Sequence, residues 1–369
     1  MLCPALREMQ THRLARTLIL VPTLAALAFL SLSGQAPVVG AKATKPISTK
    51  TWTPPLTPDG QPDLQGVWVN NSATPLERPK ELEGRLSLTD EEVAELKKRA
   101  ARLFHAGNSD FAPGDNTFLA ALANPDRYHN PNATGDSREM IEMQFENRTS
   151  LIVDPPDGRI PPLTPGARQR RDALMTAMRR LPAGPEDLSD ALRCITFGVP
   201  RLGGAFGAGP YGFYQIVQSS GHVVVFAESI HDARIIPLDG RSHLRESIRQ
   251  WNGDSRGRWE GKTLVVDTTN FSPKSHRTGS FSVPSNFMES FENLHLVERF
   301  TRVAPDTINY EMTFADATTW TKPWTAMIPL KRSREKIYEF ACHEGNEAMI
   351  GILSGARAQE KPGQEGGKK

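Results

Sequence analysis

The chain has 369 residues, and 38% of them are apolar, which is enough to form a buried core and excludes a wholly disordered chain. Its 44 basic and 42 acidic side chains nearly balance, and without residues 1–43 the net charge is −1. A balanced charge with no basic stripe argues against nucleic-acid binding. The remaining length of about 325 residues fits one large β domain or two ordinary domains.

The N-terminus has the pattern of a secretory signal peptide. Basic residues at Arg7, Arg13 and Arg16 precede an apolar run over 17–32, and small residues follow it. A membrane anchor is the alternative, but the run is shorter than the roughly 20 residues that a span needs, and Pro22 interrupts it. We therefore expect residues 1–43 to be removed and the protein to be periplasmic or secreted, with no membrane span after cleavage.

The first part of the mature chain mixes extended segments, helices and loops. Prolines and threonines over 44–65 indicate an extended arm. Residues 63–68 then read as the entry to a first strand. The sequence Thr89-Asp-Glu-Glu92 is a capping box that predicts a helix over 90–104. Residues 105–140, rich in Asn, Asp, Pro and Gly, read as a long loop.

A short strand over 149–153 and a basic helix over 165–181 follow this loop. Pro165 suits the first position of that helix and Pro182 its end. We treat 66–210 as a mixed helix and loop region that packs on the β domain described next.

The chain from 211 to 357 reads as successive short strands joined by tight turns. Alternation is clear where Ile308, Tyr310, Met312 and Phe314 share one strand face. The expected strands are 214–218, 222–228, 233–238, 258–259, 263–269, 294–303, 307–314, 324–330 and 336–343. This spacing predicts a mainly β, antiparallel, up-and-down barrel or sandwich with a few peripheral helices. Residues 358–369 are polar and are expected to be a disordered tail.

Once residues 1–43 are removed, two cysteines remain, Cys194 and Cys342. In an oxidising compartment two cysteines indicate one disulfide. Two buried free thiols, or one nucleophile with a bystander, are the alternatives, although neither cysteine lies in a nucleophile motif. A bridge would place the two Cα atoms within about 7 Å of each other.

Polar clusters at strand ends are the candidates for chemistry. His231 and Asp232 follow an apolar strand and, with His343 and Glu344, could act as an acid–base site. His231 and Asp232 cannot pair directly unless the chain bends, because adjacent strand residues face opposite sides. A structural turn is the competing interpretation. The remaining expected ligand-binding residues are Arg234, Trp251, Asp254, Arg258 and His295.

Zinc is a further possibility, since imidazole and carboxylate groups suit that ion. His231, His295 and His343 lie on three separate segments without paired ligand spacing, so we assign no metal site and identify no cofactor.

Several strings in the chain resemble a family of secreted bacterial proteins of unknown function. They are PDLQGVW (62–68), SLIVDPPDGRIPPLTP (150–165), HDARIIPLDGR (231–241), GDSRGRWEGKTLVVDTTNF (253–271) and ACHEGN (341–346). That resemblance implies a secreted setting and no particular activity. The GVW string followed by hairpins is also similar to the first strand of the lipocalins, which are up-and-down barrels.

Two functions remain open at this stage. The first is a secreted barrel that binds a small or amphipathic ligand in its mouth, and the second is an envelope hydrolase or isomerase with a His/Asp/Glu site. A purely structural envelope protein is a third alternative. If all the candidate residues border one cavity, replacing His231 or His343 by alanine should abolish binding or turnover. The sequence does not indicate an oligomeric state.

Overall fold

The computed structural model describes residues 52–105, 108–109, 116–123, 143–201, 212–274 and 291–360. The expected signal peptide and the last nine residues of the expected tail lie outside these ranges. No helix among the described residues is long and apolar enough to cross a membrane.

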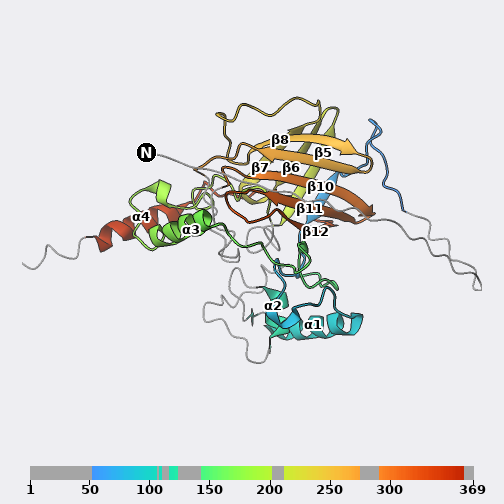
Figure 1. Cartoon of the computed structure of the whole chain (residues 1–369), viewed down its shortest axis with the longest axis horizontal. Helices are drawn as coiled ribbons and strands as arrows, with labels where there is room; N and C mark the ends of the chain where they lie inside the picture. Colours follow the sequence, from blue (N-terminus) through green and yellow to red (C-terminus); the bar gives the residue numbers. More distant parts are fainter. Residues whose placement is uncertain are drawn as a thin grey trace, which may run out of the picture. The chain divides into compact units, whose positions relative to one another are not determined.

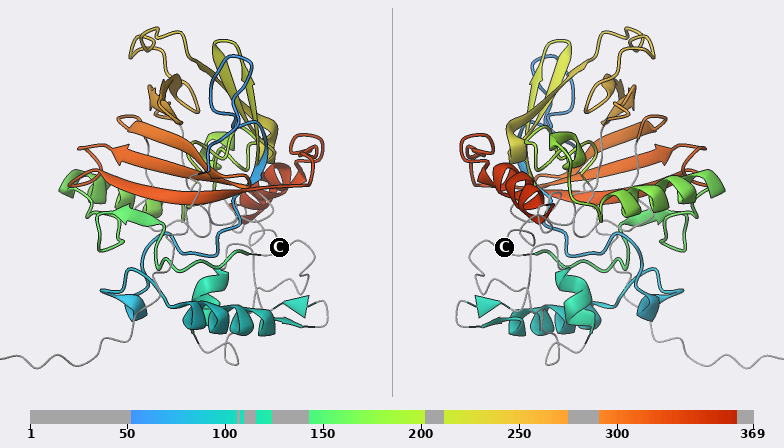
Figure 2. Two further views of the ribbon diagram at one scale, coloured as in Figure 1. Left: turned by 90° about the vertical axis from the view of Figure 1, so that its right-hand side faces the viewer. Right: turned by 90° about the vertical axis from the view of Figure 1, so that its left-hand side faces the viewer.

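A curled antiparallel sheet of ten strands, nearly closed into a barrel, dominates the structure. Nine strands follow one another in the order β7-β6-β5-β1-β12-β11-β10-β9-β8, and β4 pairs with β12 beside this path. Figure 2 shows the β5–β6 hairpin, in yellow, standing at a steep angle to the orange strands. The strands are β1 (Gly66–Val69), β4 (Ile152–Asp154), β5 (Phe213–Ser219), β6 (His222–Ala227), β7 (Asp232–Pro237), β8 (Asp254–Glu260), β9 (Thr263–Thr269), β10 (His295–Ala304), β11 (Thr307–Ala315) and β12 (Trp324–Arg332).

The sheet is closed on one side by β1, which pairs with both β5 and β12. On the other side, β7 and β8 are the ends of the hydrogen-bonded path. Because the path contains eight antiparallel pairings, β7 and β8 run in the same direction. Side chains fill the seam between them: a Cβ atom on Gly257 would lie 2.6 Å from Leu238 Cδ2 and 2.8 Å from Ile236 Cγ2. The seam is closed by packing that only a glycine at 257 allows.

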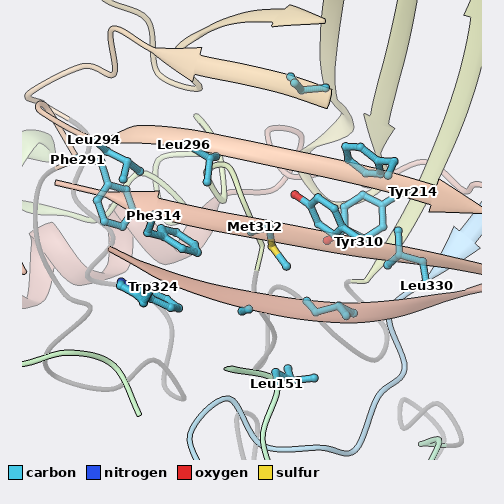
Figure 3. Close-up of a cluster of buried hydrophobic side chains, with 14 of the residues drawn as sticks. Leu151, Tyr214, Phe291, Leu294, Leu296, Tyr310, Met312, Phe314, Trp324 and Leu330 are labelled. Atoms are coloured by element: carbon cyan, nitrogen blue, oxygen red, sulfur yellow. The ribbon is translucent and has the colours of Figure 1, made fainter. Parts of the chain in front are cut away.

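The interior of the sheet is the main hydrophobic core. Alternate residues of β10, β11 and β12 are buried, as the period of two in a strand requires. Phe314 stacks on Trp324 with ring centroids 4.1 Å apart, and Trp320 packs edge-on against both. Figure 3 shows Phe291, Phe314 and Trp324 at one end of this cluster and Tyr214 and Tyr310 toward the other.

The segment before β1 covers the end of the sheet where the β10–β11 turn lies. Arg302 lies against the faces of both Trp52 and Trp68 and donates to the carbonyl oxygen of Asp63 at 2.8 Å. Gln218 accepts from the backbone N–H of Leu64 and donates to a neighbouring carbonyl. The described part of the expected arm therefore packs on the sheet rather than extending away from it.

Helices α1 (Asp90–Arg102) and α2 (Thr117–Leu122) form a second, smaller core, labelled in Figure 1. The predicted capping box is present, since Thr89 accepts from the backbone of Glu92 and the Glu92 carboxylate accepts from that of Thr89. Val93 and Leu96 are buried, as expected from their common face. The pairs β2 (Phe104–His105) and β3 (Asn108–Ser109) follow α1.

The C-terminal part differs from the prediction. Residues 336–343 form no strand, and the chain instead continues into α4 (Glu347–Gln359), which Asn346 caps. The helix therefore occupies the end of the expected β domain and the start of the expected tail. The basic helix α3 (Pro165–Ala177) begins as predicted and ends four residues early. Short 3-10 turns are η1 (Lys80–Leu82), η3 (Pro185–Asp187) and η5 (Ser229–His231).

The predicted disulfide between Cys194 and Cys342 is present, with the two Cα atoms 5.8 Å apart. Cys342 lies in the segment that follows β12, not in a last strand as expected. The bridge therefore joins that segment to the loop that contains Thr196 and Arg201. Asn346 supports the same junction by donating to the carbonyl oxygen of Leu192 at 2.8 Å.

Candidate functional site

The expected site residues do not border one cavity. Asp232 and Arg234 belong to β7, which alternates between the two faces of the sheet. They oppose Ala227 and Val225 of β6, and all four side chains line an interior cavity. The exposed Ile235 marks the outer face of the same strand.

Asp254 and His295 lie together on the outer face, in a cluster that the sequence did not reveal. His243, from the connection between β7 and β8, has Nδ1 3.0 Å from Asp254 and Nε2 3.0 Å from Asp267. His295 Nε2 is 2.8 Å from the other oxygen of Asp267. The partners of Asp267 in the neighbouring strands, Arg256 and Val297, belong to the same outer face.

His231 and His343 lie near each other, with ring centroids 5.8 Å apart. Both are exposed, Glu344 is exposed beside them, and none of the three lines the cavity. His231 is the last residue of η5, where Ile230 and His231 both have positive φ values. This tight reversal turns His231 outward and lets Asp232, the next residue, enter the sheet facing inward.

The last two expected residues lie in neither cluster. Arg258 is exposed and pairs with Glu260 at 2.7 Å. Trp251 lies beneath the guanidinium of Arg193, which is 5.7 Å from its ring centroid.

The cavity is built around an ion pair that the sheet encloses. Glu298 of β10 is fully buried, and its Oε2 lies 2.7 Å from Nη2 of Arg234. The hydroxyl of Tyr310, from β11, donates to the other oxygen of Glu298. Phe300 stacks on Tyr310 with centroids 4.4 Å apart, which fixes the ring beside the carboxylate. The phenol and the arginine thus hold this carboxylate from two strands.

A second ion pair lies at the edge of the same cavity. Arg201 Nη2 is 3.2 Å from Asp232 Oδ2, and the guanidinium also donates to both oxygens of Ser229. Asn252 donates to Asp232 Oδ1 at 3.0 Å, and Thr196 donates to Oδ2 at 2.5 Å. Two segments, the loop with Thr196 and Arg201 and the connection with Asn252, therefore converge on Asp232.

The cavity is partly open to solvent, and the centres of water-sized spheres can occupy about 40 Å³ of it. Beyond the two ion pairs, most of its wall is apolar or aromatic. The wall consists of Gly198, Val199, Pro200, Arg201, Tyr214, Ile216, Val225, Ala227, Asp232, Arg234, Asn252, Glu298, Phe300, Tyr310 and Leu330. Asp232 keeps 20% of its side chain exposed, so the cavity meets solvent beside it.

Burial controls the protonation of the tyrosines in this wall. It raises the pKa of Tyr214 to about 12; Glu298 adds to the effect, while Arg201 and Arg234 oppose it. Burial and the nearby Glu298 raise the pKa of Tyr310 well above its usual value. Both phenols are therefore protonated at neutral pH, and the hydroxyl of Tyr310 donates to Glu298. The Tyr214 hydroxyl oxygen is buried and has no hydrogen-bond partner within the described part of the chain.

Sequence reasoning assigned none of Arg201, Tyr214, Tyr310 and Glu298 to the site. For Glu298 a signal existed: it occupies an inward position between Leu296 and Phe300, where an unpaired carboxylate would be costly. A charged residue in the apolar register of a strand predicts a buried partner. Nothing in the sequence places Arg201 beside Asp232.

Comparison of the chain with protein families, curated proteins and solved structures gave no match. Among the described residues, no group of three or more His, Cys, Asp or Glu side chains is arranged to hold a metal ion.

Proposed function

We propose that this chain is a barrel-like binding protein that holds a small, largely apolar ligand in the interior cavity. The cavity carries the proposal, because protein interiors are normally packed without voids larger than a water molecule. The centres of water-sized spheres can occupy about 40 Å³ of the cavity, more than the roughly 10–15 Å³ that one water molecule needs. An apolar wall with a few fixed polar groups is also the usual composition of such sites.

We also propose that the protein works in the periplasm or outside the cell. The leader pattern of residues 1–43 and the Cys194–Cys342 disulfide support this setting, since disulfides persist in oxidising compartments. Fractionation of a bacterium that expresses the full chain should find a shortened protein outside the cytoplasm. Full-length protein in the cytoplasm would contradict the proposal.

A neutral fluorescent probe, N-phenylnaphthylamine, tests the binding function. We expect saturable binding with an increase in fluorescence, because the probe would leave water for the apolar cavity. Ala227→Phe would fill the cavity and weaken the probe's affinity at least tenfold. Ala233→Phe adds the same ring to the exposed outer face of neighbouring β7 and is the matched control.

Circular dichroism and the thermal midpoint would show that both variants fold. Equal probe binding by Ala227→Phe and Ala233→Phe would show that the probe does not use the cavity. Absence of saturable binding to the wild-type protein would overturn the proposed function.

An envelope enzyme is the second candidate, and the proximity of His231 and His343 is the observation in its favour. Their exposure counts against it, because both side chains lie outside the wall of the interior cavity. Hydrolysis of p-nitrophenyl acetate tests this candidate, with His231→Gln and His343→Gln as variants. The binding function predicts that both variants retain the wild-type affinity for N-phenylnaphthylamine, whereas a hydrolase at this pair predicts a histidine-dependent rate.

A further inference from the structure

The charges that line the cavity cancel. Arg234 faces Glu298 at 2.7 Å, and Arg201 faces Asp232 at 3.2 Å. Each guanidinium already has its carboxylate, and each carboxylate also accepts from neutral donors. A charged ligand group would therefore enter a low-dielectric space in which no opposite charge is free to compensate it. The charge balance disfavours both anionic and cationic ligands.

Two hydrogen-bond donors in the cavity wall lack partners among the residues that the structure describes. The Tyr214 hydroxyl and the Nε–H of Arg234 are both buried and make no hydrogen bond. Tyr214 is 8% exposed, and its ring lies in the interior as part of the cluster that Figure 3 shows. Buried polar groups normally have partners, so a donor left without one suggests that a bound molecule supplies the acceptor.

The side chains around these donors indicate the polarity of the rest of the ligand. Ile216, Val225, Phe300 and Leu330 line the same cavity and offer only apolar surface. A pure hydrocarbon would fill this space but would leave Tyr214 unpaired. A molecule with an oxygen acceptor on an apolar body would satisfy both parts of the wall.

We propose that the cavity selects uncharged ligands that present a carbonyl oxygen to the Tyr214 hydroxyl from one end of an apolar body. Ketones, esters and amides of apolar molecules form this class. The proposal rests on the proposed binding function, since it assigns the chemistry of the ligand in the same cavity.

Three competitors of the same shape test the proposal by displacing N-phenylnaphthylamine from the wild-type protein. They are naphthyl methyl ketone, the isosteric hydrocarbon isopropenylnaphthalene, and the anion naphthoate. We expect the ketone to bind about tenfold more tightly than the hydrocarbon, because a hydrogen bond to a buried orphan donor contributes that factor. Naphthoate should bind more weakly than the ketone.

Tyr214→Phe keeps the ring and removes only the hydroxyl. In this variant the ketone should lose its advantage of about tenfold, while the affinity of isopropenylnaphthalene stays within about twofold of wild type. Tyr338→Phe, at a tyrosine that is 66% exposed, removes a hydroxyl that is not part of the wall and should change neither affinity.

The outcomes separate this proposal from the proposed function. If the probe binds but the ketone and the hydrocarbon compete equally, the carbonyl class is wrong and the binding function stands. If naphthoate is the strongest competitor, the cavity takes anions and the charge argument is wrong. If the probe does not bind at all, the binding function itself fails.

Discussion

The Arg234–Glu298 pair allows a quantitative test of how the cavity is held together. The two side chains are 10% and 0% exposed, and Nη2 and Oε2 lie 2.7 Å apart. At about 4 Å between charge centres, the attraction is about 4 kcal/mol at an effective dielectric constant of about 20. Glu298→Met removes this attraction and leaves Arg234 buried beside an apolar group, so we expect a loss of about 3–5 kcal/mol.

The double variant Arg234→Met/Glu298→Met should be more stable than either single variant. Replacing a buried ion pair by apolar residues of similar volume is often close to neutral, because the cost of desolvating both charges disappears. Tyr310 loses its acceptor, which costs about 1–3 kcal/mol. We therefore expect the free energy of unfolding of the double variant to lie within about 3 kcal/mol of the wild-type value. This loss is well below the sum of the losses of the two single variants.

Urea unfolding followed by circular dichroism measures all four proteins of this cycle. A coupling energy of about 2 kcal/mol or more between the two sites would support the pair as described. If the single losses simply add in the double variant, the two groups do not interact in the folded protein, and our description of the cavity wall is wrong.

Three further predictions concern parts of the fold around the cavity. Burial raises the pKa of Tyr214 from 10.0 to about 12, so the contribution of this tyrosine to folding stability is complete below pH 10 and is lost as the pH rises through about 12. Tyr214→Phe should therefore make the loss of stability with rising pH less steep, as measured by alkaline unfolding followed by tyrosinate absorbance. Gly257→Val would press on Ile236 and Leu238 across the seam, and we expect urea unfolding to show a loss of about 1–3 kcal/mol, whereas an unchanged midpoint would mean that the seam is open. Cys194→Ser should lower stability by about 2–5 kcal/mol, and a reductant should lower the wild-type melting temperature but not that of the variant.

The strands were the most predictable part of this protein. Alternation and turn residues located β5–β7 and β9–β12 to within a few residues, because a half-buried strand must alternate and a hairpin needs turn chemistry. Prediction failed after residue 332, where aromatic and charged residues over 336–343 suggested a strand. That segment pairs with no strand edge; the disulfide and the cap of α4 hold its end instead.

The site was predictable only in part. Asp232 and Arg234 were found because they form a dense polar cluster at a strand end. His231 has the opposite orientation, as the alternation rule required, so one cluster in sequence became two locations in space. Partners such as Arg201 come from loops, whose positions depend on tertiary contacts rather than on a local pattern.

The number of strands explains why polar groups meet on both faces of this sheet. Nine strands in a closed path cannot all be antiparallel to their neighbours, so one junction must bring two parallel strands together, and here it is the junction of β7 and β8. Parallel neighbours need a connection that returns along the length of the sheet. Residues 238–253 make that return, placing His243 against Asp254 on the outside and Asn252 against Asp232 at the cavity. The connection that this parallel junction requires thus delivers polar side chains to both sides of the seam.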